Sequence, residues 1–205
     1  MHSFALEEQI LFEDNHLIVV NKKAGELVQG DKTGDTPLSE KIKEYLKHKY
    51  HKPGEAFIGV VHRLDRPTTG VVVFAKTSKA LARLNRQFAE KTTQKTYWAL
   101  VEKSPLPATG ILQHFLKKNA ANNTSKAFEK EIPQSKTGRH HQIRVQLSAM
   151  GWPIKGDLKY GAARSNKDGS ICLHARSLCI EHPVSREKMT FTAPVPDLSP
   201  WPECR

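Results

Sequence analysis

The sequence predicts an α+β fold in which helices pack on a mixed, largely antiparallel central sheet. β-Rich runs and amphipathic helical segments follow one another along the 205 residues, without the regular alternation that builds a parallel α/β sheet. No internal repeat and no Pro/Gly-rich linker divides the chain, which is long enough to bury a core without disulfides or a metal. We therefore expect a single domain over residues 1–205.

The first part of the chain predicts a β-hairpin followed by a helix. Residues 10–21 hold two apolar runs on either side of an Asp-Asn turn, which is typical of a hairpin. Thr36 and Pro37 favour a helix start, with Thr36 as N-cap and Pro37 as the first helical residue. Apolar residues then recur at helical spacing from Leu38 to Leu46, so we expect one face of this helix to be buried.

Two further helices are predicted. Ser78 is expected to cap one of them, and the other is expected over residues 141–150. In the second of these, Ile143, Leu147 and Met150 share one apolar stripe, which predicts the buried face. The other strands are predicted by β-rich runs at residues 60–64, 71–76, 96–101, 173–181 and 189–192.

The charge of the chain favours a polyanionic partner. Lys and Arg total 32 against 21 Asp and Glu, which gives a formal net charge of +11 with neutral His. The composition excludes a disordered chain, a collagen and a disulfide scaffold.

The sequence predicts a cytoplasmic protein. The N-terminus is acidic and lacks the basic segment of a secretory signal, and the apolar run Val71 to Ala75 is too short to cross a membrane. Cys172, Cys179 and Cys204 cannot all pair within one chain, and their spacing does not match a zinc site. We expect idle thiols in a reducing compartment.

Asp65 lies where a functional carboxylate would be placed by a rigid scaffold. In an extended strand, residues two apart share a face, so Arg63 and Asp65 are expected to point the same way and His62 the other way. Pro67 then bends the chain and leaves the carboxylate at a strand end beside a loop. Taken alone, such an aspartate is more often a turn residue or the partner of a nearby arginine.

Three ordered sequence blocks change that reading. The run from His62 to Gly70 begins His-Arg-Leu-Asp and ends Thr-Thr-Gly, the run from Lys95 to Val101 reads Lys-Thr-Tyr-Trp-Ala-Leu-Val, and the run from Gly138 to Arg144 reads Gly-Arg-His-His-Gln-Ile-Arg. In these blocks the chain resembles the RluA-type RNA pseudouridine synthases over most of its length. The resemblance implies the fold of that family with a basic active-site cleft, and the conversion of uridine to pseudouridine in structured rRNA or tRNA without a cofactor or a metal.

The resemblance also implies the catalytic residues. Asp65 is the carboxylate that acts at the sugar or the base, and Arg144 is the guanidinium that keeps it ionised where desolvation would raise its pKa. Tyr97 stacks on the uracil and helps to remove the C5 proton. Without the motifs, Arg144 would be interpreted as a solvated helix residue and Tyr97 as a core tyrosine.

Other residues are implied to hold the RNA. The target base must leave its stack, and Arg63 is the side chain expected to fill the gap, while Leu173 and Ile143 line the base pocket and Arg139 contacts the RNA. The remaining candidates are cations that could contact phosphates: Lys76, Lys79, Arg83, Arg86, Lys155, Lys159 and Arg164. We expect no membrane or metal partner and a monomer.

Two departures from the family pattern are expected. Catalytic-type sequence begins near Ile10, which leaves no room before it for the small S4-type RNA-binding domain of many relatives. A strand pair that the family places before the Gly-Arg block is reduced to a stub at residues 125–136, or else part of it is missing from the chain.

Two other functions compete with the isomerase. A non-catalytic RNA-binding or RNA-folding module on the same fold would share the basic charge but would not need Asp65, Tyr97 and Arg144 together. A metal-dependent nuclease is disfavoured, because Asp65 has no acidic neighbour in the sequence with which to hold an ion.

Overall fold

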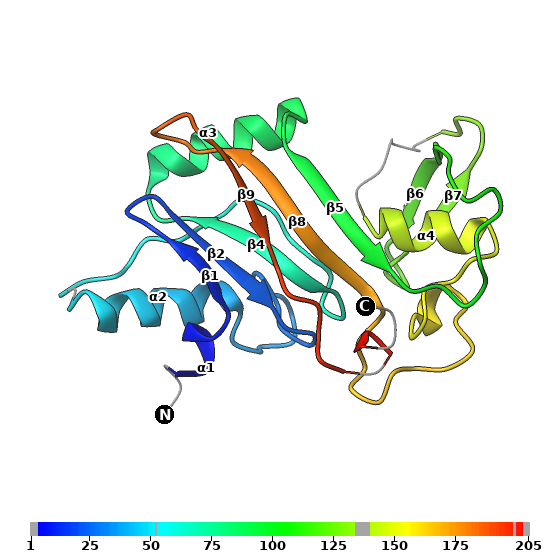
Figure 1. The fold of residues 1–205 in the computed structure, drawn as a ribbon, viewed down its shortest axis with the longest axis horizontal. Helices are drawn as coiled ribbons and strands as arrows, with labels where there is room; N and C mark the ends of the chain where they lie inside the picture. Colours follow the sequence, from blue (N-terminus) through cyan, green and yellow to red (C-terminus); the bar gives the residue numbers. More distant parts are fainter. Residues whose placement is uncertain (1–3, 52, 134–139, 199, 203–205) are drawn as a thin grey trace. The chain divides into compact units, whose positions relative to one another are not determined.

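The computed structural model describes residues 4–51, 53–133, 140–198 and 200–202, drawn in Figure 1. These residues form two compact units. Unit 1 contains the chain as far as Trp98 and again from His174 onward, and unit 2 contains residues 99–173.

Unit 1 is built on a seven-stranded sheet (Figure 1). Its strands lie in the order β1 (Ile10–Glu13), β2 (Leu17–Lys22), β4 (Thr69–Ala75), β8 (Leu173–Glu181) and β5 (Gln94–Ala99), with β3 (Gly59–Val60) on β4 and β9 (Lys188–Thr192) on β8. The pairs β1–β2, β2–β4, β3–β4 and β8–β9 are antiparallel, whereas β4 and β8 are parallel. This arrangement confirms the mixed, largely antiparallel sheet.

Helices cover both faces of this sheet. Alternate residues of β2 and β4 point to opposite faces, and nearly all of them are apolar and buried. One face packs on α2 (Leu38–Lys49) and the short α1 (Phe4–Glu7), and the other packs on α3 (Ser78–Glu90), as Figure 1 shows. Burial on both faces explains why β4 is a continuous apolar run.

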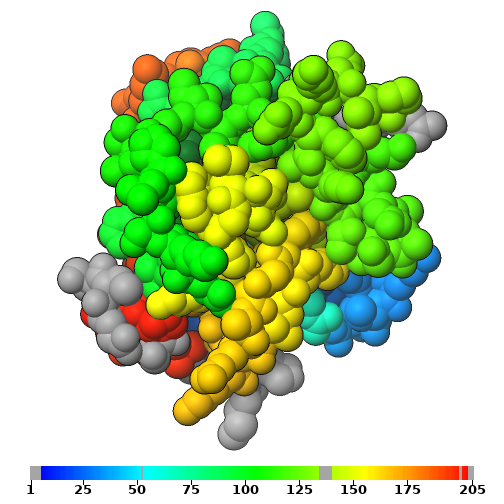
Figure 2. All heavy atoms as spheres, turned by 90° about the vertical axis from the view of Figure 1, so that its right-hand side faces the viewer, coloured from blue at the N-terminus to red at the C-terminus, as the bar shows by residue number. Residues whose placement is uncertain are grey.

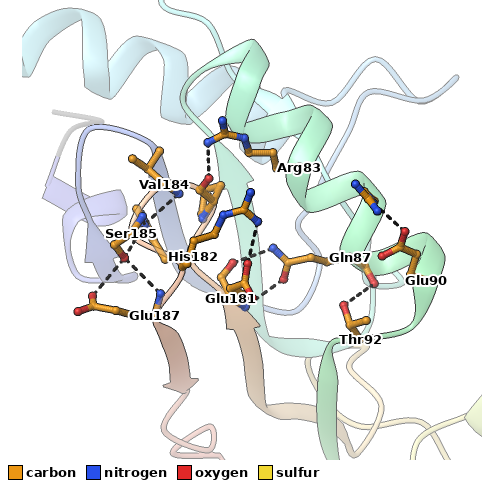
Figure 3. Close-up of polar contacts among 12 residues, drawn as sticks. Arg83, Gln87, Glu90, Thr92, Glu181, His182, Val184, Ser185 and Glu187 are labelled. Carbon is orange, nitrogen blue, oxygen red and sulfur yellow. Dashed lines mark hydrogen bonds and ion pairs between the residues drawn. The ribbon is translucent and has the colours of Figure 1, made fainter.

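The turn between β8 and β9 is fastened to α3 by polar contacts (Figure 3). The side-chain amide of Gln87 donates to the carbonyl of Glu181 at 2.8 Å and accepts from the Glu181 amide at 3.0 Å. Arg83 donates to the carbonyl of Pro183. Arg86 pairs with Glu90 at 2.7 Å along the same helix. Arg83 and Arg86, both predicted to contact phosphates, therefore have partners within the protein.

Unit 2 contains a separate hairpin and a short helix. The hairpin pairs β6 (Phe115–Asn119) with β7 (Thr124–Phe128), and it is followed by α4 (Gln142–Ala149) and the 3₁₀ turn η1 (Leu158–Tyr160). Leu116 of the hairpin packs with Val145 of α4 and Tyr160 of η1, which forms a small core.

The structure confirms the predicted helices and most strands, with shifted ends. Pro37 rather than Thr36 is the N-cap of α2. Thr77 rather than Ser78 caps α3, because its side chain accepts the Ala80 amide. The expected strand 60–64 is wrong beyond Val60.

Two expectations for unit 2 are also corrected. The buried residues of α4 are Arg144, Val145 and Gln146, whereas Met150 is 41% exposed, so the predicted apolar stripe is not the buried face. The strand pair before the Gly-Arg block is present, but it lies at residues 115–128. None of the helices in the described residues is long and apolar enough to cross a membrane.

Candidate functional site

Asp65 lies in a turn rather than at the end of a regular strand. The residues from Val61 to Asp65 have no strand pairing, and the Thr68 amide donates to the Asp65 carbonyl at 3.0 Å to close the turn. Asp65 is half-buried and Arg63 is exposed. The argument that alternation places both side chains on one strand face therefore does not apply.

A buried lysine lies beneath this turn. The ammonium of Lys22 is fully buried at the end of β2 and donates to the carbonyls of Lys23 and Arg66 at 3.0 Å and of Thr68 at 2.7 Å. Burial lowers the pKa of Lys22 to about 8, against the nearby negative charges of Glu26 and Asp65, which raise it. Lys22 holds the backbone on both sides of Pro67. Sequence reasoning missed it, although a lysine ending an apolar strand was a visible signal.

His62 fixes the other side of the turn. Its Nε2 accepts the Val73 amide at 3.2 Å, and its ring stacks on Phe88 with centroids 4.8 Å apart. Burial, reinforced by the charge of Lys95, lowers the pKa of His62 to about 3, so the ring is neutral at physiological pH. His62 therefore points inward and supports the fold of the turn.

The turn ends at a close approach between β4 and β8. Thr69 Oγ1 lies 2.8 Å from Nδ1 of the fully buried His174. Gly70 has a φ of +116°, and a Cβ on it would collide with the backbone of Ala175. Only glycine fits this position without forcing the two strands apart.

Tyr97 lies on β5 in the electrostatic field of Asp65. Its side chain is half-buried, and burial, followed by the negative charge of Asp65, raises its pKa to about 12. The phenol is therefore protonated at neutral pH. The structure thus brings together these two predicted catalytic residues within unit 1. The next residue, Trp98, is exposed and lies against the guanidinium of Arg176, whose carbon is 4.7 Å from the ring centroid.

Arg144 is held by a carboxylate that the sequence did not indicate. Its Nε and Nη2 donate to the two oxygens of Asp157 at 2.7 Å each, and the two side chains are 5% and 1% exposed. The Tyr160 ring lies on the guanidinium, with its centroid 5.0 Å from the carbon. A planar guanidinium held at both ends has a fixed direction. The predicted solvated alternative for Arg144 is wrong.

The remaining predicted residues lie at separate places along the chain. Leu173 is buried at the start of β8, and Ile143 is half-buried in the first turn of α4. Arg139 lies outside the described residues. Lys76 is not a phosphate contact, since its ammonium is bound to Glu13 at 2.7 Å and its side chain is 7% exposed.

The described residues offer no cluster of three or more His, Cys, Asp or Glu side chains able to hold a metal ion. Cys172 is buried, and its sulfur accepts a hydrogen bond from Asn166 at 3.4 Å.

Comparison with known proteins gives consistent matches. The family model for RNA pseudouridylate synthase matches residues 16–149. The chain is 32% identical to the RNA pseudouridine synthase YhcT of Bacillus subtilis (93% of this chain, 69% of the relative). It is 33% identical to ribosomal large subunit pseudouridine synthase C of Vibrio cholerae and 34% identical to that of Haemophilus influenzae, covering 66% of each and 93% and 92% of this chain. The chain thus spans about two thirds of the length of these relatives.

Solved structures show the same fold. Human RNA pseudouridylate synthase domain containing 4 superposes with a TM-score of 0.75 at 22% identity, over 95% of this chain and 91% of that one. Human RNA pseudouridylate synthase domain containing 1 gives a TM-score of 0.70 at 24% identity, over 93% and 84%. With the family model matching well over half of the chain, these comparisons establish that it belongs to the RNA pseudouridylate synthase family.

Proposed function

We propose that this protein isomerises uridine to pseudouridine in structured RNA, with Asp65 as the catalytic carboxylate. The observation that supports it best is that Tyr97 lies within electrostatic reach of the half-buried Asp65, since its pKa is raised by burial and then by the charge of that carboxylate. The names of the relatives agree with the reaction, and those of the Vibrio and Haemophilus proteins favour large-subunit rRNA over tRNA as the substrate.

The reaction needs no change in composition. The bond between N1 and C1′ breaks, the detached uracil turns in its pocket, C5 bonds to C1′, C5 loses its hydrogen as a proton and N1 gains one. Asp65 acts at the sugar or the base while the bond breaks. The turn that carries it is braced from below by Lys22 and from the side by His62, so the carboxylate meets the ribose in one position.

The surroundings of the other predicted residues suggest the role of each one. Tyr97 stacks on the uracil, and because its pKa is high, it takes the C5 proton only as its own proton passes to water. Arg144, whose guanidinium is directed by Asp157, is the cation that the resemblance to the family assigns to this reaction. The exposed Arg63 enters the RNA stack in place of the everted base.

The test is release of tritium from RNA labelled at uridine C5. We expect Asp65→Asn to abolish release and to leave RNA binding intact. Glu44→Gln, which removes an exposed carboxylate on α2, serves as the matched control and should keep normal activity. Normal release by Asp65→Asn would contradict the assignment.

The same assay separates the competing function. A non-catalytic RNA-binding module would bind RNA in both forms and release no tritium in either. Pseudouridine mapping of rRNA and tRNA, with and without the gene, then identifies the substrate.

A further inference from the structure

The β6–β7 hairpin of unit 2 contains an unfavourable pair of charges. Its register places Lys117 directly opposite Lys126, and both side chains are exposed. Like charges directly opposite each other on neighbouring strands destabilise a hairpin. The pair therefore does not stabilise the folded chain by itself, whereas an anion bound between the two ammonium groups would relieve their repulsion.

No acidic side chain of the described residues compensates the pair. The chain has no Asp or Glu between Glu102 and Glu129, and no ion pair in the described part of the chain involves Lys117 or Lys126. Further positive charge lies close by. Lys118 is exposed on the neighbouring position, and the ammonium of Lys159 donates to the carbonyl of Asn123 at the hairpin turn at 3.4 Å.

The face that carries this pair also carries two aromatic rings. Phe115 lies opposite Phe128, next to the lysine pair and on the same face, and both are half-buried. The Lys126 ammonium lies 5.6 Å from the centroid of the Phe128 ring. Cations beside aromatic rings suit a nucleic-acid strand, because the cations neutralise phosphates and the rings accept bases that have left their stack.

The hairpin is a fixed platform rather than a loose arm. Its opposite face packs on α4 and η1 through Leu116. The Ser125 amide donates to the Tyr160 hydroxyl at 2.8 Å, and Ser125 Oγ lies 2.8 Å from Nδ1 of His140. Nε2 of the same ring lies 3.0 Å from Oδ1 of Asn123. These contacts hold the backbone that carries the lysine pair at the surface, where Figure 2 shows the yellow-green atoms of this segment.

We infer that the outward face of the β6–β7 hairpin, made of Phe115, Lys117, Lys126 and Phe128, binds the sugar-phosphate backbone of the substrate RNA. That the polyanion is RNA rests on the proposed function. The surface does not include the residues proposed to carry out the chemistry, so its contribution is affinity and orientation.

The experiment measures RNA binding as a function of salt, with bulk tRNA and fragmented large-subunit rRNA as probes, in the Asp65→Asn background so that no turnover occurs. Lys117→Gln/Lys126→Gln should bind about tenfold more weakly near 0.1 M salt, and its log–log salt slope should fall by about 1.4–1.8, the value for two phosphates. The control Lys43→Gln/Lys47→Gln removes the same charge from α2 and should bind within about twofold of the parent. Binding is independent of catalysis, so absence of isomerase activity leaves this test intact.

A stability measurement excludes a structural explanation. Because the lysine pair is repulsive, Lys126→Glu should raise the melting temperature by pairing with Lys117 and should weaken RNA binding further. The inference is overturned if this variant binds RNA like the parent, or if the hairpin and α2 double variants lose equal affinity.

Discussion

The guanidinium of Arg144 and the carboxylate of Asp157 form two parallel hydrogen bonds of 2.7 Å, out of contact with solvent. Removing both charges from water costs about as much as their attraction returns, so such a pair does little for net stability. Its effect is geometric, because it fixes the plane and direction of the Arg144 guanidinium.

Asp157→Asn should destabilise the protein by about 3–5 kcal/mol, because it leaves a buried guanidinium without its counter-charge. Urea unfolding measures this loss. Glu181→Gln provides the control, since it breaks the exposed pair of Glu181 with Arg186 and should cost less than about 1 kcal/mol. Equal losses in the two variants would show that burial of the Arg144 pair has no energetic consequence.

Asp65→Asn should lower the pKa of Tyr97 from about 12, because it removes the negative charge that disfavours the phenolate. Burial remains, so the pKa should stay above the ordinary value of 10. The absorbance of tyrosinate against pH measures the change, and Tyr97→Phe identifies which transition belongs to this residue. An unchanged titration would mean that Asp65 and Tyr97 do not interact, and the proposed site would lose its main support.

Stability should fall as the pH drops below about 6.5, and His62 should account for part of the loss. The pKa of His62 is lowered from 6.5 in the unfolded chain to about 3 in the folded protein. Between these two pH values the unfolded chain binds a proton at His62 and the folded protein does not, so acid favours unfolding. The stabilisation is therefore complete above pH 6.5 and is lost progressively toward pH 3. Buried His174, whose pKa is also lowered by burial, acts in the same direction.

Melting temperatures at pH 7.5, 5.5 and 4.5 measure this dependence. His62→Gln keeps an acceptor for the Val73 amide, and it should be less stable at pH 7.5 but lose less on acidification. His48→Gln, at an exposed position on α2, should keep the parent's pH dependence. A His62→Gln curve parallel to that of the parent would contradict the assignment.

The elements of unit 1 were predictable because local patterns determine them. The run from Leu17 to Val20 and the run from Val71 to Ala75 are apolar at every position, which is what burial between two helix layers requires. The end of the strand at Val60 was not predictable in this way. There, the Val73 amide donates to the ring of His62 instead of to the backbone of a neighbouring strand. The residue pattern alone does not predict that a side chain replaces a strand at this point.

The predictability of the site differs from residue to residue. The motif resemblance indicated Asp65, Tyr97 and Arg144, and the structure places the first two within electrostatic reach of each other. The supporting residues Lys22 and Asp157 were not predicted, because their roles depend on contacts with Thr68 and Arg144 that form only when the chain folds. Sequence spacing carries no record of such pairings.

The chain leaves the sheet for unit 2 and returns to it at two neighbouring strands. β5 ends at Ala99 and β8 begins at Leu173, these strands are neighbours, and the Leu100 amide donates to the Cys172 carbonyl at 3.0 Å across the junction. Residues 100–172 are thus a cassette whose two ends are already joined. Exchanging this cassette between relatives would replace the β6–β7 hairpin surface without interrupting β5, which carries Tyr97, or the turn that carries Asp65.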